Sequence, residues 1–230
     1  MKIKFAMLTA FVATSAAYAN SFMFMTPTGS STGGGPVNAS ATVTTNANGT
    51  VSITLNDLQA NPTDVAQLVS DFDFVLSNGA TTGTGLVQGG STIFVAGDGT
   101  TTAGPAATGW QINNNVGGGI QIDALGGGQP MDLIIEPPGA GGVYSNANGS
   151  IAGNGPHNPF INQQATFILS VAGVTDATRV TSATFSFGTT AGIDVPGVPP
   201  STVPEPSSVL LLGCVVGGVF VTLRKRFVSK

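Results

Sequence analysis

Alternating apolar and polar positions dominate the middle of this chain. Within Thr50–Asn56 every second residue is Val, Ile or Leu, and most of the residues between them are Thr or Ser. A period of two predicts a strand with one buried face. The preceding Asn48-Gly49 readily takes the positive φ of a tight turn. We therefore predict a β-hairpin formed by Ala41–Asn46 and Thr50–Asn56.

Short runs of the same kind recur as far as residue 188, and glycine clusters separate several of them. Helical spacing occurs in Thr63–Ser70, after Asn61-Pro62, and predicts one or two helical turns. The further predicted strands are Asp71–Ser77, Ser91–Ala96, Gly109–Asn113, Gly119–Leu125, Met131–Glu136, Ala165–Val171 and Val180–Gly188. Many short strands with frequent turns predict an all-β fold, a single jelly-roll-like β-sandwich with one short helix. A β-helix is the alternative, but the chain has no regular repeat.

The N-terminus has the pattern of a secretory signal peptide. Lys2 and Lys4 precede the apolar run Phe5–Val12, and Ala17-Tyr18-Ala19 is a small-x-small cleavage site. This pattern predicts a signal helix over residues 1–19 and a cut before Asn20.

The C-terminus has a second apolar run of a different kind. Residues 208–223 carry no charge, and Arg224, Lys225 and Arg226 follow directly. The run is short for a hydrocarbon core of about 30 Å, but flanking basic side chains can extend outward to the headgroups. Positive residues stay on the cytoplasmic side, so the chain before this predicted transmembrane helix lies outside. The basic cluster therefore acts as the stop-transfer signal.

The residues just before this span add a specific motif. Val203-Pro204-Glu205-Pro206, the short span and the basic tail together resemble the PEP-CTERM sorting signal. In that family the membrane-embedded cysteine protease-transpeptidase exosortase recognises Pro-Glu-Pro, removes the helix and releases the protein to the cell surface or matrix. The resemblance implies that Pro204, Glu205 and Pro206 are recognition residues and that exosortase is the processing partner. The alternative is a stiff linker to a permanent anchor.

A looser resemblance to the exported bodies of the same family lies in the middle of the chain. It implies a β-sandwich body of largely unassigned function and brings no catalytic residues with it. The segments that carry it are Asp71–Ser77, Gly155–Ile161, Ala165–Phe167 and Val180–Thr189.

These features divide the chain into five parts. They are a signal peptide (1–19), a flexible lead (20–36), a β-sandwich domain (37–189), a Pro-rich linker (190–202) and the sorting signal (203–230, with the motif at 203–206, the span at 208–223 and the basic tail at 224–230).

Charge is distributed unevenly between the ends and the middle. Six of the seven Lys and Arg residues lie in the targeting ends, and Arg179 is the one basic residue between Asn20 and Pro206. All eleven acidic residues lie in that interval, so its formal net charge is −10. A surface of this kind excludes nucleic acid as a partner, since nucleic acid needs clustered Lys or Arg. It favours solubility outside the cell and is compatible with divalent cations.

Candidate chemistry in the middle is sparse. His157 is the only histidine and Cys214 the only cysteine, so neither a two-histidine metal site nor an intramolecular disulfide can form. A Ser-His-Asp triad that uses His157 stays a formal alternative, but we interpret His157 as a residue that orders its loop. We expect no catalytic, cofactor or metal residues. With eleven acidic residues in the chain, a pair of catalytic carboxylates of the glycosidase type stays an alternative, although no pair stands out.

Two weaker alternatives concern ligands. Asp71 and Asp73 alternate on a predicted strand, so both point the same way and could chelate Ca²⁺, although a solvated outer face is the simpler interpretation. Trp110 and Tyr144 could stack on sugars, but the alternation of Trp110 with Ile112 favours the core.

These observations lead to one functional expectation and two alternatives. We expect a non-enzymatic protein of a Gram-negative bacterium that passes through the inner membrane, is cut by exosortase and reaches the cell surface or the exopolysaccharide matrix of a biofilm. The alternatives are a lectin-like module that binds extracellular polysaccharide with the help of Ca²⁺ and, more remotely, a secreted hydrolase.

Overall fold

The computed structural model describes residues 19–126 and 130–200. The chain divides into two units at Pro199, and the strands described here all belong to the first unit. They are β1 (Asn20–Met25), β2 (Ser31–Thr32), β3 (Gly35–Pro36), β4 (Ala39–Thr45), β5 (Thr50–Asp57), β6 (Val69–Leu76), β7 (Gly83–Gly89), β8 (Ser91–Val95), β9 (Thr101–Ala106), β10 (Gln111–Val116), β11 (Gly119–Asp123), β12 (Ile134–Ile135), β13 (Phe160–Asn162), β14 (Gln164–Val171), β15 (Val180–Phe187) and β16 (Asp194–Pro196). The predicted all-β class is confirmed.

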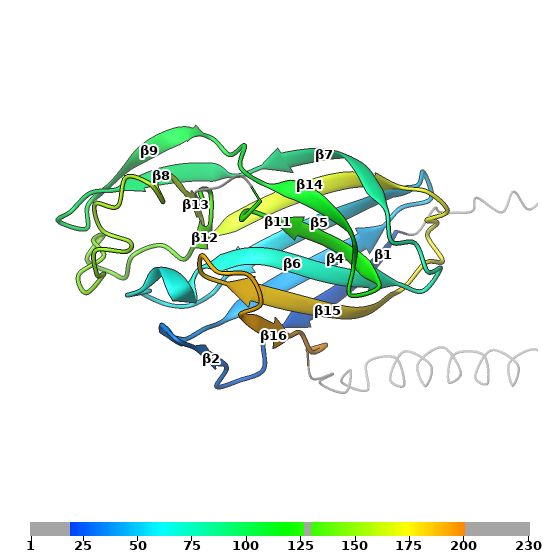
Figure 1. Ribbon diagram of the computed structural model, residues 1–230, viewed down its shortest axis with the longest axis horizontal. Coiled ribbons are helices and arrows are strands. Elements are labelled where there is room, and N and C mark those ends of the chain that lie inside the picture. The colour runs from blue at the N-terminus through cyan, green and yellow to red at the C-terminus, as the bar shows by residue number, and fades with distance from the viewer. Residues whose placement is uncertain (1–18, 127–129, 201–230) are drawn as a thin grey trace, which may run out of the picture. The chain divides into compact units, whose positions relative to one another are not determined.

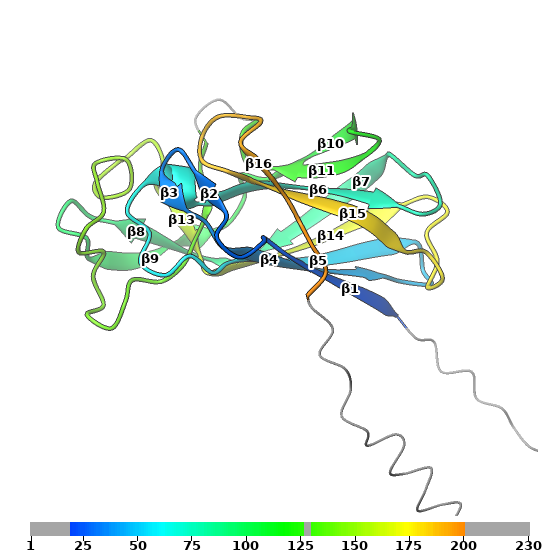
Figure 2. The same ribbon diagram turned by 90° about the horizontal axis from the view of Figure 1, so that it is seen from below.

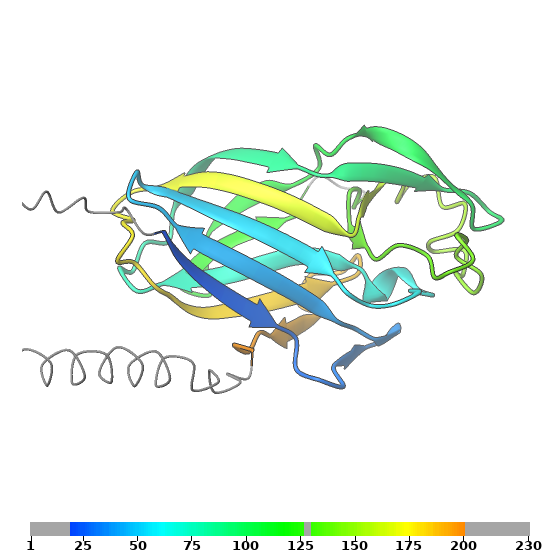
Figure 3. The same ribbon diagram turned by 180° about the vertical axis from the view of Figure 1, so that it is seen from behind.

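Two curled sheets face each other (Figures 1 and 2). The first sheet has the order β1-β4-β5-β14-β7 and faces the viewer in Figure 3. The second sheet runs β10-β11-β6-β12-β13-β8-β9, and β15 pairs with both β6 and β16. The described pairings are antiparallel except β12 with β13. This arrangement agrees with a β-sandwich, and the jelly-roll-like connectivity stays a prediction.

The predicted hairpin is present as β4 and β5. Its turn is built by Asn48, whose side-chain oxygen accepts hydrogen bonds from the backbone N–H and the hydroxyl of Thr50. Gly49 follows with φ +80°, a conformation that glycine adopts without strain. Asp98 with Thr100 and Asn148 with Ser150 make the same contacts. Several turns are therefore stabilised by the same pair of hydrogen bonds, which an Asn or Asp side chain accepts from a Thr or Ser two residues later.

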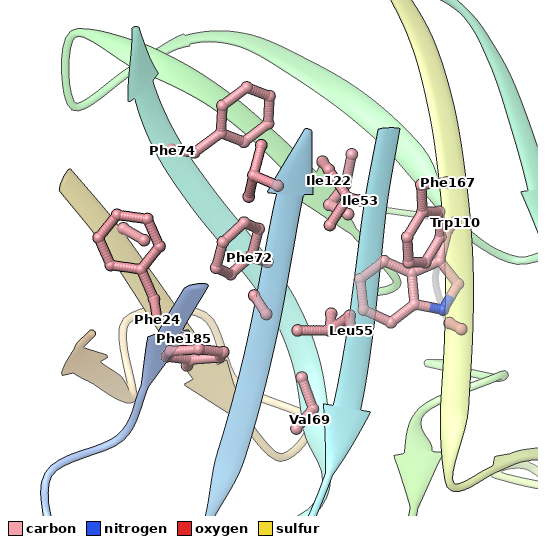
Figure 4. Close-up of a cluster of buried hydrophobic side chains, with 14 of the residues drawn as sticks. Phe24, Ile53, Leu55, Val69, Phe72, Phe74, Trp110, Ile122, Phe167 and Phe185 are labelled. Carbon is pink, nitrogen blue, oxygen red and sulfur yellow. The ribbon is translucent and has the colours of Figure 1, made fainter. Parts of the chain in front are cut away.

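The main core lies between the two sheets (Figure 4). Phe72 and Phe185 pack with ring centroids 5.2 Å apart, and Trp110 packs on Phe167 at 4.8 Å. Leu55 of the facing sheet is completely buried among these aromatic side chains. Alternation along the strands thus supplies one apolar face from each sheet.

A smaller apolar cluster lies apart from the main core. Its members come from η1, β8, β12, β13 and the loops between them, and are Val65, Leu68, Val95, Leu133, Ile135, Tyr144, Ile151 and Phe160. Element η1 (Val65–Gln67) is a single 3₁₀ turn where one or two helical turns were predicted. Asp64 caps it, since its side chain accepts a hydrogen bond from the backbone N–H of Ala66.

Several strands differ from the prediction, and each has a physical reason. Strands β7 and β9 were not predicted, because their glycine, threonine and alanine residues show no apolar alternation. The predicted strand Met131–Glu136 shrinks to Ile134–Ile135, since Asp132 takes a positive φ of 61°.

The predicted flexible lead and the predicted Pro-rich linker also contain strands. Strand β1 lies in the predicted lead and pairs with β4 along its whole length. Strand β16 lies in the predicted linker and pairs with β15, and Val198 bridges to Met25. These edge strands follow from hydrogen bonding to a neighbouring strand, which a local pattern cannot reveal.

The predicted signal helix and the predicted transmembrane helix, with the Pro-Glu-Pro motif and the basic tail, fall on residues outside the described ones. Among residues 19–126 and 130–200 there is no helix with the length and apolar character that crossing a membrane requires.

Candidate functional site

The most unusual polar group lies on the outer face of the second sheet. Phe72 and Phe74 point from β6 into the core, so the alternating Asp71 and Asp73 lie on the opposite face. Asp71 is nevertheless only 2% exposed, and Asp73 is half-buried. The two side chains do point the same way, as the sequence predicted, but they are not a simple solvated surface.

Neighbouring strands bring two further acids to the same face. In the register of β11, Asp123 lies opposite Asp71 and Gln121 lies opposite Asp73. On the other side, β15 places Ser186 beside Asp71 and Thr184 beside Asp73. Strand β16 then places Asp194 beside Ser186, and all four strands are seen side by side in Figure 1. We call Asp71, Asp73, Asp123 and Asp194 the carboxylate row.

The carboxylate row receives its hydrogen bonds from neutral donors. Ser186 donates its hydroxyl to Asp194 Oδ1 at 2.6 Å. Asn113 donates both amide hydrogens, to Asp123 Oδ2 at 2.9 Å and to Gln121 Oε1 at 2.8 Å. Oδ1 of Asp71 and Oδ1 of Asp73 are buried and have no partner. Each of these two acids therefore keeps one buried oxygen without a partner.

Burial and mutual repulsion change the acidity of the row. Burial raises the pKa of Asp71 to about 7, repulsion from Asp73, Asp123 and Asp194 adds to the rise, and a hydrogen bond with Ser186 offsets part of it. Burial likewise raises the pKa of Asp73 to about 6, repulsion from Asp194 contributes, and a hydrogen bond with Gln121 offsets part of the rise.

Positive charge is scarce around the row. Arg179 is the one Lys or Arg among the described residues, and its exposed side chain lies just before β15. Its backbone pairs with Ser77, which follows the end of β6 that is remote from Asp71. No described basic side chain therefore belongs to the row.

A cavity of about 250 Å³ lies beside the row. Asp73 and Asp194 line it together with the hydroxyl residues Ser182 and Thr184. Thr184 lies between Asp73 and the β16 strand in the sheet register. The cavity wall therefore combines two carboxylates and hydroxyl oxygens.

A second pair of acids lies elsewhere, where β5 ends. Asp57 is completely buried, and burial raises its pKa well above the ordinary value, with repulsion from Glu136 adding to the rise. The backbone N–H of Gln59 donates to Asp57 Oδ1 at 2.9 Å and opposes this rise. Burial also raises the pKa of the half-buried Glu136. The Tyr144 hydroxyl donates a hydrogen bond to the Glu136 carbonyl oxygen at 2.9 Å, and burial raises the pKa of this tyrosine as well.

The other sequence candidates are built into the fold. His157 Nδ1 lies 3.0 Å from the Ser150 carbonyl oxygen, which agrees with the predicted role of ordering its loop. Trp110 is 4% exposed and donates its indole N–H to the Asp132 carbonyl at 2.8 Å. The core interpretation of Trp110 is confirmed. Tyr144 is 2% exposed, so the sugar-stacking hypothesis for these two rings is wrong in this fold.

Sequence inspection missed Asp123 and Asp194 as members of the site. They lie far from Asp71 in the chain, and only the strand order brings them together. Within the part of the chain that the structure describes, no three His, Cys, Asp or Glu side chains are gathered into a ready-made metal site.

Comparison of this chain with models of protein families, with curated proteins and with solved structures finds no match.

Proposed function

We propose that this protein is an exported, non-enzymatic surface or matrix protein that exosortase cuts near Pro204–Pro206. The observation that carries the proposal is the C-terminal order of Pro-Glu-Pro, an uncharged apolar run and a basic cluster. Each part has a physical role. The prolines hold Glu205 extended, the run holds the chain in the inner membrane, and the basic residues set its orientation.

The folded body is compatible with removal of both ends. Strand β1 begins at Asn20, the residue that follows the predicted signal-peptide cut. The last described strand, β16, ends at Pro196, before the Pro-Glu-Pro motif. Neither cut would therefore remove a described strand, so the mature chain would keep its sheets.

A passive role agrees with how the candidate catalytic groups are used. His157 and Trp110 hold loops through hydrogen bonds. Asp57 and Glu136 are a carboxylate pair, but Asp57 is completely buried and cannot contact a polymeric substrate in this arrangement.

The test is a double substitution in the motif. Pro204→Ala with Pro206→Ala is expected to leave a longer, membrane-bound protein, because exosortase would no longer recognise the motif. Pro199→Ala with Pro200→Ala removes an upstream proline pair and serves as the matched control. The measurement is the intact mass and location of each protein, and an unchanged mature mass and location for the motif variant would contradict the proposal.

Polysaccharide binding is a second proposal, and the carboxylate row with its cavity is the observation in its favour. It cannot use Trp110 or Tyr144 as stacking platforms, since both rings are buried. Glycan-array binding that EDTA abolishes would support it, whereas binding that survives EDTA or no binding would count against it.

A further inference from the structure

The outer face of the first sheet is uncharged, in contrast to the outer face of the second. Strands β1, β4, β5, β7 and β14 contain one charged residue, Asp57, and its side chain is completely buried. The segment from Asn20 to Pro206 nevertheless has a formal net charge of −10. Its acids are therefore kept away from the sheet that faces the viewer in Figure 3. A neutral face on an acidic body is suited to an uncharged partner.

Hydroxyl side chains stand on this face where charges are missing, and the strand register arranges them in rows. One row across the sheet consists of Thr84, Ser170 and Thr50, and another of Thr166, Thr54 and Thr42. Neighbouring strands lie about 4.7–4.9 Å apart, so each row is a regular series of hydroxyl groups. Between the two rows, Ile168 lies opposite Val87, and these side chains are 46% and 63% exposed. The face thus combines hydroxyl rows with a small aliphatic patch.

A hollow of about 420 Å³ lies at one end of this face, beside the turn between β4 and β5. The described residues that line it include the exposed hydroxyl residues Thr82, Thr84 and Ser170 and the exposed amide of Asn48, and none of them is charged. Asn48 uses its side-chain oxygen within the turn, so its amide hydrogens remain for a ligand. Small-molecule sites have volumes of about 300–1,000 Å³. The hollow is therefore large enough for a ligand and offers it neutral hydrogen-bonding groups.

We propose that this hollow and the hydroxyl rows beside it bind an uncharged polysaccharide. Sugar hydroxyls donate and accept hydrogen bonds, as the hydroxyls of Thr84 and Ser170 do. The C–H faces of sugar rings can pack against the aliphatic patch of Ile168 and Val87. The inference rests on the proposed matrix location for the presence of such a polymer around the protein, and it uses a different surface from the carboxylate row.

Charge distinguishes this ligand from other partners. An anionic polysaccharide or a nucleic acid needs basic side chains, and neither the hollow nor the five strands of this sheet contain any. A second copy of the chain would bring two bodies of net charge −10 together. It would also remove water from hydroxyl groups that do not all find a new partner. An uncharged polymer meets neither obstacle.

Repetition supplies the affinity. Trp110 and Tyr144 are buried and cannot stack on a sugar, so a single sugar unit has only hydrogen bonds and the aliphatic patch to bind to. A polymer presents the same groups at regular intervals, and its contacts with the hollow and with successive rows act together. We therefore expect a polymer to bind about a hundredfold more tightly than its disaccharide unit.

Affinity electrophoresis of the full-length, uncut chain tests the proposal independently of exosortase cleavage. The protein, purified in mild detergent, migrates in native gels that contain EDTA and dextran, galactomannan, xyloglucan or mixed-linkage β-glucan, and alginate and polymer-free gels serve for comparison. We expect at least one of the four neutral polymers to slow the protein severalfold and alginate to have no effect. No retardation by any of the four, or equal retardation by alginate, would overturn the proposal. Retardation that appears only without EDTA would assign binding to the carboxylate row and would overturn it as well.

Three substitutions locate the binding surface. Ser170→Glu places a charge in the hollow and should weaken binding about tenfold, because a neutral sugar cannot balance that charge. Ile168→Ala removes aliphatic contact and should weaken binding severalfold. Thr102→Glu is the matched control, because Thr102 is exposed on β9 of the second sheet, and this variant should behave as the wild type does. Equal retardation of the wild type and a folded Ser170→Glu variant would contradict binding at this face.

Measurements on the unaltered chain keep the test decisive if a variant fails to fold. The comparison of neutral polymers with alginate needs no substitution. Sedimentation velocity without polymer tests the competing occupant, a second copy of the chain, and we expect a monomer. A dimer that Ser170→Glu disrupts, together with no retardation by the neutral polymers, would show that a second copy covers this face and would overturn the proposal.

Discussion

The two faces of β6 are built from consecutive residues and have opposite character. On the inner face, Phe72 and Phe74 are completely buried and pack within the aromatic cluster. On the outer face, Asp71 and Asp73 are crowded by other acids and keep oxygens without partners. One strand can therefore supply the stability of the fold on one side and carry a crowded, partly buried row of carboxylates on the other.

The largest effect is expected on the inner face. Phe72→Ala should lower the free energy of unfolding by about 3–5 kcal/mol, since it leaves a cavity beside Phe185. Urea unfolding followed by circular dichroism measures it. Phe94→Ala is the control, because Phe94 is 41% exposed, and its loss should be much smaller. Similar losses for both variants would show that β6 does not anchor the core.

The outer face should respond in the opposite direction. Asp71→Asn removes a buried charge whose pKa is raised to about 7, so the variant should be more stable than the wild type at pH 8 in EDTA. One pKa unit corresponds to about 1.4 kcal/mol, which sets the upper limit of the gain at about 4 kcal/mol. A loss of stability at pH 8 would contradict the electrostatic account of the row.

The sign of the pH dependence follows from the same pKa values. The folded state holds protons on Asp71 and Asp73 more tightly than the unfolded chain, so their contribution favours folding at low pH. That contribution is lost as pH rises from about 4 to 7 for Asp71 and to about 6 for Asp73. Unfolding at a series of pH values should show a flatter profile for Asp71→Asn, with a residual slope from Asp57, whose pKa is also raised.

The seam between β11 and β6 should tolerate little change. A Cβ atom on Gly119 would lie 2.3 Å from the backbone oxygen of Phe74, so one of the strands must move. Gly119→Ala is therefore expected to cost about 1–3 kcal/mol. Gly97→Ala is the control, because nothing lies within 4 Å of its added Cβ. Equal thermal stability of the two variants would contradict the described register.

The smallest effect concerns the Ser186 hydroxyl, which donates a hydrogen bond to Asp194 of the carboxylate row. Ser186→Ala removes the hydrogen bond to Asp194 and should cost about 1 kcal/mol at pH 8. Ser182→Ala also removes a hydroxyl from the cavity wall, but Ser182 is exposed, so its effect should be near zero. Thermal unfolding of both variants at pH 8 would separate them, and a larger effect for Ser182→Ala would be inconsistent with the row as described.

Local sequence predicted what depends on local rules. The hairpin β4–β5 followed from alternation and Asn-Gly, and the core position of Trp110 followed from its alternation with Ile112. The same rules placed Asp71 and Asp73 on one face. These features need only the two-residue period of a strand and the conformational freedom of a turn.

What depends on strand order could not be predicted. Strand β1 and strand β16 exist because they find partners at sheet edges, and their own sequences lack a clear alternation. The carboxylate row needs β11, β6, β15 and β16 to be neighbours, and nothing in the sequence near Asp123 or Asp194 specifies that. Long-range pairing therefore limited the prediction of the site more than the prediction of the fold class.

The intact mass of the protein collected outside the cells tests the central claim of export and cleavage most directly. We predict a chain that begins at Asn20, ends near Pro204–Pro206 and carries the complete β-sheet body. A mass that still includes the apolar run 208–223 would contradict cleavage at the motif and, with it, release to the cell surface or matrix.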